Sequence, residues 1–145
     1  MMTSVRAQIE HLQQLAENDP DNPELLAALG NVYYDAGMAE RAVDYYDRAL
    51  ALEPGNINVL VDKATMLRLL GRAEEAVQIL TQIVAGAPDH EQALFNLGVI
   101  YLSDLSDTSS AIEAWKTFLE TNPNAEHAAA VRQEVQRLEQ ASGRR

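Results

Sequence analysis

The sequence predicts an all-α fold in which short helical hairpins repeat along the chain as a solenoid. The first observation is a period, because four of the five prolines lie 34, 34 and 35 residues apart, at Pro20, Pro54, Pro88 and Pro123. The second is that small residues keep the same step; they are Ala42, Ala76 and Ala111 and, at another position of the period, Gly30, Ala64 and Gly98. The third is that each period holds two stretches of apolar residues at three-to-four spacing, which is typical of two amphipathic helices.

Composition narrows the class of protein. A chain of 145 residues that is 47% apolar can bury the core of one domain or of one short repeat array. The absence of cysteine excludes disulfides, thiolate catalysis and cysteine-ligated zinc. A net charge of −11 repels phosphate backbones, so we expect no nucleic-acid partner.

Neither a signal peptide nor a membrane span is predicted. Arg6 and Glu10 interrupt the N-terminus where a signal peptide needs an apolar run. The longest uncharged stretch, residues 76–88, is 13 residues long, whereas a span needs about 20 apolar residues. We expect no membrane insertion and a cytoplasmic location, or a periplasmic one if the chain is part of an anchored protein.

Residues 1–22 are predicted to form an N-terminal flanking segment with a helix over 5–17. Ile9, Leu12 and Leu15 stand 34 residues before Val43, Tyr46 and Ala49. The segment therefore corresponds to the second helix of a repeat that lacks its first helix.

Residues 23–56 form the first predicted repeat, with helices over 23–36 and 39–52. Asn22 followed by Pro23 is a strong helix start, because a capping side chain precedes a proline at the first helical position. Gly37 supplies the left-handed conformation that ends the first helix. Pro54 closes the unit.

Residues 57–90 and 91–124 form the second and third repeats. Asp89 with Gln92 resembles a capping box and predicts the start of the third repeat. The turn of that repeat, residues 103–108, has one extra residue and no glycine. Asp104 and Asp107 in this turn offer either a small cation site or turn and capping groups. They lack the number of ligands that calcium requires, which favours capping.

Residues 125–140 complete the predicted array as a C-terminal capping helix. Ala128, Val131, Val135 and Leu138 form its apolar stripe. A terminal helix with one polar face is what ends a repeat array. Residues 141–145 are predicted to be a frayed tail.

These repeats resemble the tetratricopeptide repeat family, and the resemblance covers residues 23–124. The family pattern requires a bulky residue, Leu-Gly, Tyr, a turn Gly, Ala, an aromatic residue, Ala and Pro. The first repeat supplies Leu26, Leu29, Gly30, Tyr33, Gly37, Ala42, Tyr46, Ala49 and Pro54; the second supplies Leu60, Ala64, Leu67, Gly71, Ala76, Leu80 and Pro88; the third supplies Leu94, Leu97, Gly98, Tyr101, Ala111, Trp115 and Pro123. The second repeat departs from the pattern at Lys63, which replaces the leucine.

The resemblance implies a right-handed α-solenoid that holds a segment of another protein on its concave surface. Family geometry lines this groove with residues of the first helix of each repeat. The corresponding residues are Glu24, Ala27, Asn31, Tyr34, Asp35, Asn58, Val61, Thr65, Arg68, Gln92, Phe95, Asn96 and Val99. Aromatic anchors and amides in this set suit an extended peptide.

A plainer interpretation stands beside the groove for several of these residues. Phe95, Val99 and Leu102 could instead pack under the terminal helix, because residues 125–140 follow directly. Arg68 could neutralise the acidic residues of its own surface rather than contact a ligand.

One subtype of the family is disfavoured. Chaperone-binding members use a carboxylate clamp of lysine, asparagine and arginine. The corresponding positions here are Ala27, Asn31, Asp62, Gln92 and Asn96, of which Asn31 alone matches. A terminal carboxylate would meet an acidic surface without a cation to hold it.

The sequence shows no pattern for catalysis or cofactor binding. His11, His90 and His127 are far apart and have no ligand partner at i+3 or i+4. Neither a nucleophile elbow nor a glycine-rich phosphate loop is present. We expect a protein that is not an enzyme and that holds neither metal nor cofactor.

The leading functional hypothesis is a bacterial-type protein–protein interaction scaffold whose peptide partner is neutral or basic. A second hypothesis is a homodimer formed through the terminal helices, because Val5, Ile9, Leu12 and Leu15 leave an apolar stripe at the N-terminal end. A third is the soluble domain of a cell-envelope or cytochrome c biogenesis-type assembly factor, which the chain resembles in general repeat style.

Overall fold

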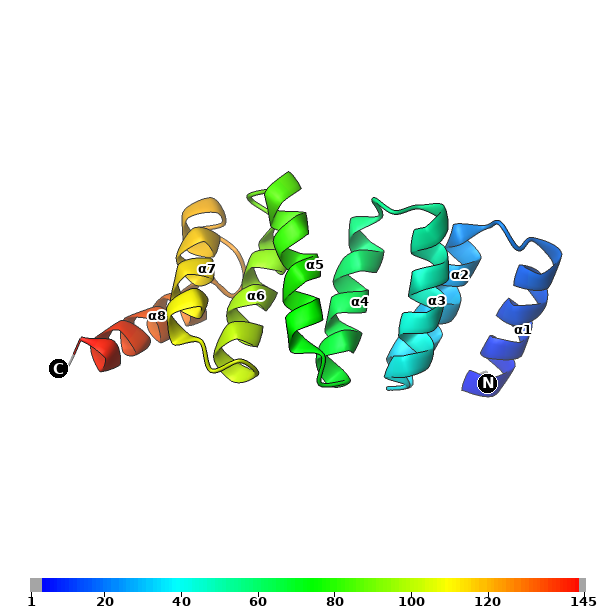
Figure 1. Ribbon diagram of the computed structural model, residues 1–145, viewed down its shortest axis with the longest axis horizontal. Helices are drawn as coiled ribbons and strands as arrows, with labels where there is room; N and C mark the ends of the chain where they lie inside the picture. Colours follow the sequence, from blue (N-terminus) through cyan, green and yellow to red (C-terminus); the bar gives the residue numbers. More distant parts are fainter. Residues whose placement is uncertain (1–3, 144–145) are drawn as a thin grey trace. The chain divides into compact units, whose positions relative to one another are not determined.

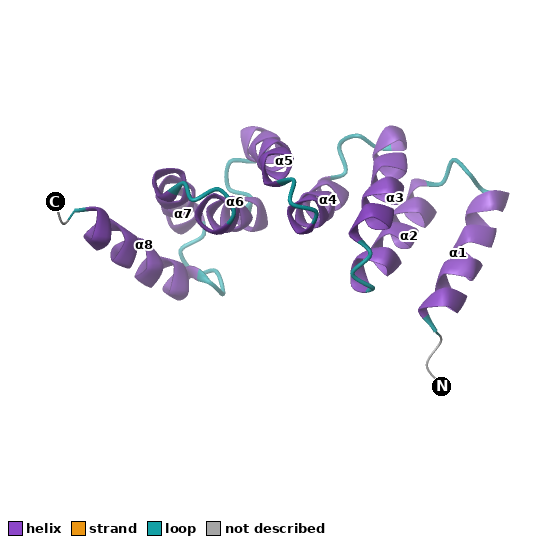
Figure 2. Ribbon diagram, turned by 60° about the horizontal axis from the view of Figure 1, so that its bottom comes forward, coloured by secondary structure: helices purple, strands orange, loops and turns teal. Residues whose placement is uncertain are grey.

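The computed structural model describes residues 4–143, a range in which all regular structure is helical and the helices are joined by short loops (Figure 2). Residues 1–3 and 144–145, which were assigned above to the N-terminal segment and the tail, lie outside this range. The helices are α1 (Val5–Asn18), α2 (Pro23–Asp35), α3 (Ala39–Leu52), α4 (Ile57–Leu69), α5 (Ala73–Gly86), α6 (Glu91–Ser103), α7 (Thr108–Thr121) and α8 (Ala128–Ser142). The predicted all-α class is confirmed.

The helices form two compact units. The first ends at Arg72 and contains α1 to α4; the second begins at Ala73 and contains α5 to α8. The division falls in the turn of the second predicted repeat.

In the first unit, α2 and α3 form a helical hairpin (Figure 1). Leu26, Leu29 and Tyr33 are the buried large residues of α2, at the spacing the sequence predicted. The ring of Tyr46 from α3 is wholly buried and lies on Gly30, where an added Cβ would stand 2.5 Å from Tyr46 Cε1. The small residue at position 30 is therefore required for the two helices to approach.

Helix α1 packs against α2, and α4 packs against α3. Ala16 of α1 is buried, and Gln13 Nε2 donates a hydrogen bond to the Tyr45 hydroxyl at 3.4 Å. Of the predicted N-terminal apolar stripe, Val5 and Leu15 remain 46% and 39% exposed, whereas Ile9 and Leu12 are half-buried.

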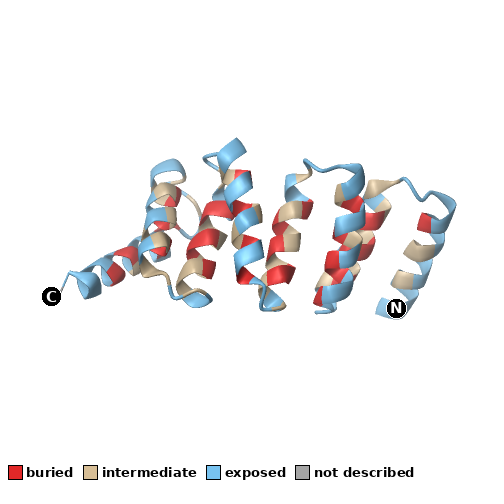
Figure 3. Ribbon diagram, viewed as in Figure 1, coloured by how far each residue is buried: buried red, intermediate tan, exposed pale blue. Residues whose placement is uncertain are grey.

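In the second unit, α6 and α7 form the corresponding hairpin. An added Cβ at Gly98 would overlap the indole of Trp115, so the close approach seen at Gly30 is repeated with a larger ring. Helix α8 packs against α7 and contributes buried residues, red in Figure 3, to an apolar cluster. The buried members of this cluster are Leu94, Trp115, Phe118, Ala128, Val131, Val135 and Leu138.

Most helix ends follow their sequence signals. The Asn22 side chain accepts hydrogen bonds from the backbone N–H groups of Glu24 and Leu25. Gly37 and Gly71 have φ values of 73° and 76°, the left-handed conformation that glycine adopts most readily. Asp107 caps α7, because its Oδ1 accepts from the Ser110 amide at 3.1 Å and its Oδ2 accepts from the Ser110 hydroxyl at 2.7 Å.

Three predicted helix ends are wrong, one on α6 and both on α8. Asp89 does not cap α6: the helix begins at Glu91, and His90 Nδ1 accepts from the Ala93 amide at 3.1 Å. Histidine can replace aspartate as the capping residue because a ring nitrogen without a hydrogen accepts a hydrogen bond, as a carboxylate oxygen does. At the other end, α8 begins at Ala128 rather than at residue 125 and continues to Ser142, two residues into the segment predicted to fray.

Candidate functional site

The first unit carries a surface hollow of about 330 Å³ that joins two predicted groove helices. Asn31, Tyr34 and Asp35 reach it from α2, and Asp62 reaches it from α4. The hollow thus brings together residues of the first helices of two successive repeats, which are 27 to 31 positions apart in sequence.

The floor of this hollow is held by a hydrogen bond from the core. The hydroxyl of Tyr46 donates to Asn31 Oδ1 at 2.6 Å. Burial, and after it the charges of Asp62 and its neighbours, raises the pKa of the Tyr46 hydroxyl far above its usual value. The hydroxyl therefore stays protonated, remains a donor and keeps the Asn31 side chain in place.

The hollow is electrostatically negative. Burial raises the pKa of the Asp62 carboxyl, and the nearby Asp35 carboxylate raises it further. The nearest lysine in sequence, Lys63, is engaged elsewhere, with its Nζ 2.6 Å from Asp47 Oδ1. A positively charged ligand would relieve the repulsion between Asp35 and Asp62.

The other predicted groove residues of the first unit have different surroundings. Glu24 and Asn58 are exposed, and Ala27 and Arg68 are partly exposed. The Thr65 hydroxyl donates to the Val61 carbonyl at 3.2 Å within its own helix.

Val61 was wrongly placed in the groove. Its side chain is 2% exposed and belongs to a buried set on α4 that also includes Val59, Ala64, Met66 and Leu67. An inner helix of a repeat array has neighbours on more than one side, so its buried surface is wider than a single stripe.

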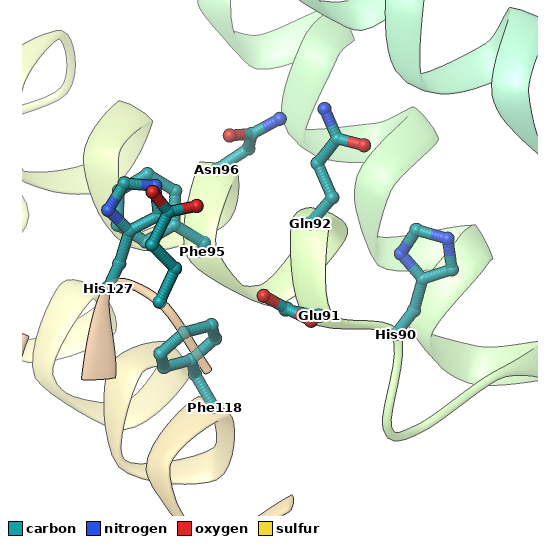
Figure 4. A pocket seen from close by; sticks show the side chains of 8 residues that line it. His90, Glu91, Gln92, Phe95, Asn96, Phe118 and His127 are labelled. Atoms are coloured by element: carbon teal, nitrogen blue, oxygen red, sulfur yellow. The ribbon is translucent and has the colours of Figure 1, made fainter. Parts of the chain in front are cut away.

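The second unit carries a larger hollow, of about 530 Å³, between the start of α6 and the turn that precedes α8 (Figure 4). It brings together Gln92, Phe95 and Asn96 of the predicted set. Its remaining lining residues are His90, Glu91, Phe118, Glu126 and His127.

An aromatic pair forms part of this hollow. The rings of Phe95 and His127 are stacked, with centroids 4.8 Å apart and planes inclined by 19°. Beneath them, Phe95 also contacts Phe118 at 5.9 Å between centroids, and its backbone carbonyl accepts from Trp115 Nε1 at 3.1 Å. Phe95 is thus anchored in the core while its ring reaches the surface.

Phe95, Val99 and Leu102 all pack against the cluster closed by α8. This is the alternative that the sequence left open for them. Val99 and Leu102 do not line the hollow, whereas Phe95 has both roles.

Glu126 and His127 were not predicted to belong to a site. The predicted helix over 125–140 included both residues, so nothing in the sequence indicated that they lie in a turn. The start of α8 at Ala128 leaves them in the turn, facing α6.

Neither hollow offers the chemistry of a clamp for anions. Of the described residues that line the two hollows, none is a lysine or an arginine. Within residues 4–143, no group of three or more histidine, aspartate or glutamate side chains is arranged to hold a metal ion. No helix in the same range has the length and apolarity needed to cross a bilayer.

Comparison with known proteins identifies the family. A model described as tetratricopeptide repeat matches residues 6–60 and 33–94, and a second model of that description matches residues 92–125. The chain belongs to the tetratricopeptide repeat family. Its repeats also match part of anaphase-promoting complex subunit 3 from Schizosaccharomyces pombe, with 35% identity over 91 residues, 63% of this chain and 14% of that protein. The chain spans between 6% and 14% of the length of the curated relatives it matches.

Solved tetratricopeptide structures share the fold. A tetratricopeptide repeat protein from Parabacteroides merdae superposes with a TM-score of 0.83 at 24% identity, covering 94% of this chain and 54% of that one. The first tetratricopeptide domain of Spaghetti, solved with an HSP90 peptide of sequence SRMEEVD, superposes with a TM-score of 0.70 at 23% identity, covering 82% of this chain and 91% of that one. At these identities the likeness concerns the fold.

Proposed function

We propose that this tetratricopeptide chain is a non-catalytic scaffold that binds a neutral or basic segment of a partner protein. Each unit offers a first-helix face of its own for binding: that of α2 and α4 in the first unit and that of α6 in the second. The observation that carries the proposal is the hollow formed by Asn31, Tyr34, Asp35 and Asp62, which combines an amide, an aromatic ring and two carboxylates. An amide pairs with an extended backbone, an aromatic ring provides contact area, and the carboxylates select a cation.

The charge of the ligand follows from the contrast with the domain of Spaghetti. That domain was solved with a peptide that carries two glutamates and one aspartate. In this chain, the clamp position at Asp62 is acidic and lies near Asp35, so a ligand of that kind would add carboxylates to a surface that already repels them. We therefore propose a partner segment of the opposite charge.

Site-specific photo-cross-linking in the native lysate tests the proposal. A photoreactive phenylalanine derivative replaces Tyr34 in one variant and the exposed Gln92 in another. Matched controls carry it at Asp44 on α3 and at Glu113 on α7, both of which are exposed on second helices. We expect Tyr34 and Gln92 each to capture a segment of a partner protein, identified by mass spectrometry, that the matched controls do not capture.

The controls decide the outcome. If the partner is captured from Asp44 and Glu113 but not from Tyr34 or Gln92, the first-helix face is not the binding surface. A captured segment rich in glutamate and aspartate would contradict the proposed charge of the partner.

A second candidate, self-association through α1, is favoured by the exposure of Val5 and Leu15. Sedimentation of the full chain at high concentration should then show a dimer. Replacing both side chains by glutamate should give a monomer, because two charges cannot be buried unpaired in an interface. A full-length chain that is already monomeric at high concentration removes this candidate.

A further inference from the structure

The hollow in the second unit combines an exposed aromatic stack with carboxylates and amides. The Phe95 and His127 rings form one wall, and Figure 4 shows Gln92 and Asn96 projecting from α6 beside them. The carboxylates of Glu91 and Glu126 line the same hollow. Its volume, about 530 Å³, admits a long side chain.

We propose that this hollow holds the guanidinium group of an arginine side chain in the partner segment. The inference rests on the proposed function and names the residue type that the second unit selects. It concerns the surface between α6 and the turn before α8, and it requires nothing of the hollow in the first unit.

Charge complementarity gives the sign of the ligand. The charged groups that line the hollow are carboxylates, in a chain whose net charge is −11. Two cations near α8 are paired with carboxylates outside the hollow. Lys116 Nζ lies 2.8 Å from Glu139 Oε2, and Arg137 is paired with Glu134. Neither Lys116 nor Arg137 is among the lining residues, so the carboxylates of the hollow have no such cation beside them.

Ring geometry favours arginine over lysine. A guanidinium is planar, stacks on an aromatic face and donates up to five hydrogen bonds in a fork that matches a carboxylate. The face of the His127 ring that is turned away from Phe95 supplies the aromatic surface, and the adjacent Glu126 supplies the carboxylate. The ammonium of lysine is a compact, strongly hydrated charge that uses the flat face less well.

The amides complete the set of acceptors. Gln92 and Asn96 stand one helical turn apart on α6, so their side-chain amides lie on the same face of the helix, beside the hollow. They can accept from the guanidinium N–H groups that do not face a carboxylate. The hollow thus brings together an aromatic ring, carboxylates and amides, the groups that recognise a planar cation.

A titration with three matched peptides tests the inference. The probes are acetylated and amidated pentapeptides, Gly-Ala-Xaa-Ala-Gly, in which Xaa is arginine, lysine or citrulline. Citrulline has the shape of arginine without its charge. NMR follows the aromatic resonances of Phe95 and His127 and the backbone amides of residues 91–96.

We expect the arginine peptide to shift these resonances saturably, with lysine weaker and citrulline at least about tenfold weaker. Removing the stacked ring in His127→Ala should weaken the arginine peptide about two- to fivefold, the size of an exposed cation–π contact. Glu126→Gln should weaken it similarly, and the effect should shrink with added salt. Both side chains are exposed, so the fold tolerates their loss, and Glu120→Gln on α7 is the matched charge control.

Two results overturn the inference: equal binding of the citrulline peptide, or unchanged binding in both His127→Ala and Glu126→Gln. If this happens while Tyr34 and Gln92 still capture a partner segment, the scaffold function stands and its arginine specificity falls. If capture comes from Asp44 and Glu113 alone, the scaffold surface itself is wrong.

Discussion

At the scale of single residues, the contacts of two glycines with aromatic rings set the spacing within the hairpins. A methyl group at Gly98 would overlap the Trp115 indole, and the ring cannot move without losing its hydrogen bond to the Phe95 carbonyl. Gly98→Ala should therefore lower the free energy of unfolding by about 1–3 kcal/mol, the usual cost of overpacking. Chemical denaturation measures it.

A matched substitution exists in the same unit. Gly86, the last residue of α5, has no atom within 4 Å of an added Cβ. Gly86→Ala should leave stability unchanged or raise it by up to about 1 kcal/mol, because alanine is the better helix former. Equal losses at Gly86 and Gly98 would contradict the packing explanation.

A second residue-scale prediction concerns Asp62. Its pKa is raised in the folded protein, so the carboxylate costs stability at pH values above its folded pKa, and this cost disappears as the pH falls below the ordinary value of 3.8. Asp62→Asn should raise the free energy of unfolding at pH 7 by roughly 0.5 kcal/mol or less, since solvent screens a half-exposed group.

Urea denaturation at two pH values checks the sign. The gain from Asp62→Asn should be present at pH 7 and absent near pH 3. Asp44→Asn, the same change at an exposed position on α3, is the control. A variant that is less stable than the parent at pH 7 would show that the carboxylate makes a favourable contact instead.

At the scale of helices and turns, the turn of the third hairpin, between α6 and α7, contains no glycine. Ser106 adopts a φ of 52° where the first two turns use Gly37 and Gly71. The left-handed conformation costs a non-glycine residue about 1–2 kcal/mol. Glycine avoids this cost, but the greater conformational entropy of glycine in the unfolded chain lowers stability by about 0.5–1 kcal/mol. Ser106→Gly should therefore stabilise the protein by up to about 1 kcal/mol.

The same replacement inside a helix should have the opposite sign. Ser109 lies within α7, where Ser109→Gly should destabilise by several tenths of a kcal/mol. Thermal unfolding of the two variants gives the comparison. A loss of stability in Ser106→Gly would mean that the serine side chain contributes more than its backbone costs.

Sequence periodicity predicted helices and hairpins well because their causes are local. Asn22, Gly37 and Gly71 act within a few residues of themselves, so their roles can be inferred from the chain alone. His90 shows the limit of this approach. Its ring and the Asp89 carboxylate are both acceptors, and the choice between them depends on where the backbone enters α6.

The candidate site was less predictable because it depends on contacts between helices. Position in the repeat identified Asn31 and Tyr34, but it could not indicate that the Tyr46 hydroxyl orients Asn31. Position also placed Val61 in the groove, although packing buries it. His127 belongs to the site because α8 begins three residues later than predicted, at Ala128. A periodic pattern does not locate a helix start to within three residues.

At the scale of the whole molecule, a destabilising substitution should loosen mainly the compact unit that contains it, because each repeat of a solenoid contacts only its neighbours. Trp115 is 6% exposed in the cluster of the second unit. Trp115→Ala should cost about 3–5 kcal/mol. Hydrogen exchange should then accelerate most in residues 91–140.

The first unit provides the internal control. Amides of α2 and α3 should keep most of their protection in the Trp115→Ala protein, since their core is built on Tyr46 and Leu29. Equal acceleration over residues 23–52 would show that the chain unfolds as one cooperative body.

The hydrogen bond from Trp115 to the Phe95 carbonyl has an optical consequence. Trp115 is the only tryptophan of the chain, and its indole N–H is tied to the residue whose ring lines the hollow of the second unit. A ligand that displaces Phe95 changes the polarity and hydrogen bonding around the indole, and therefore the wavelength and intensity of its emission. The protein thus carries its own fluorophore directly behind the proposed arginine-binding surface, so a ligand-induced movement of Phe95 can be followed in the unlabelled chain with ultraviolet light alone.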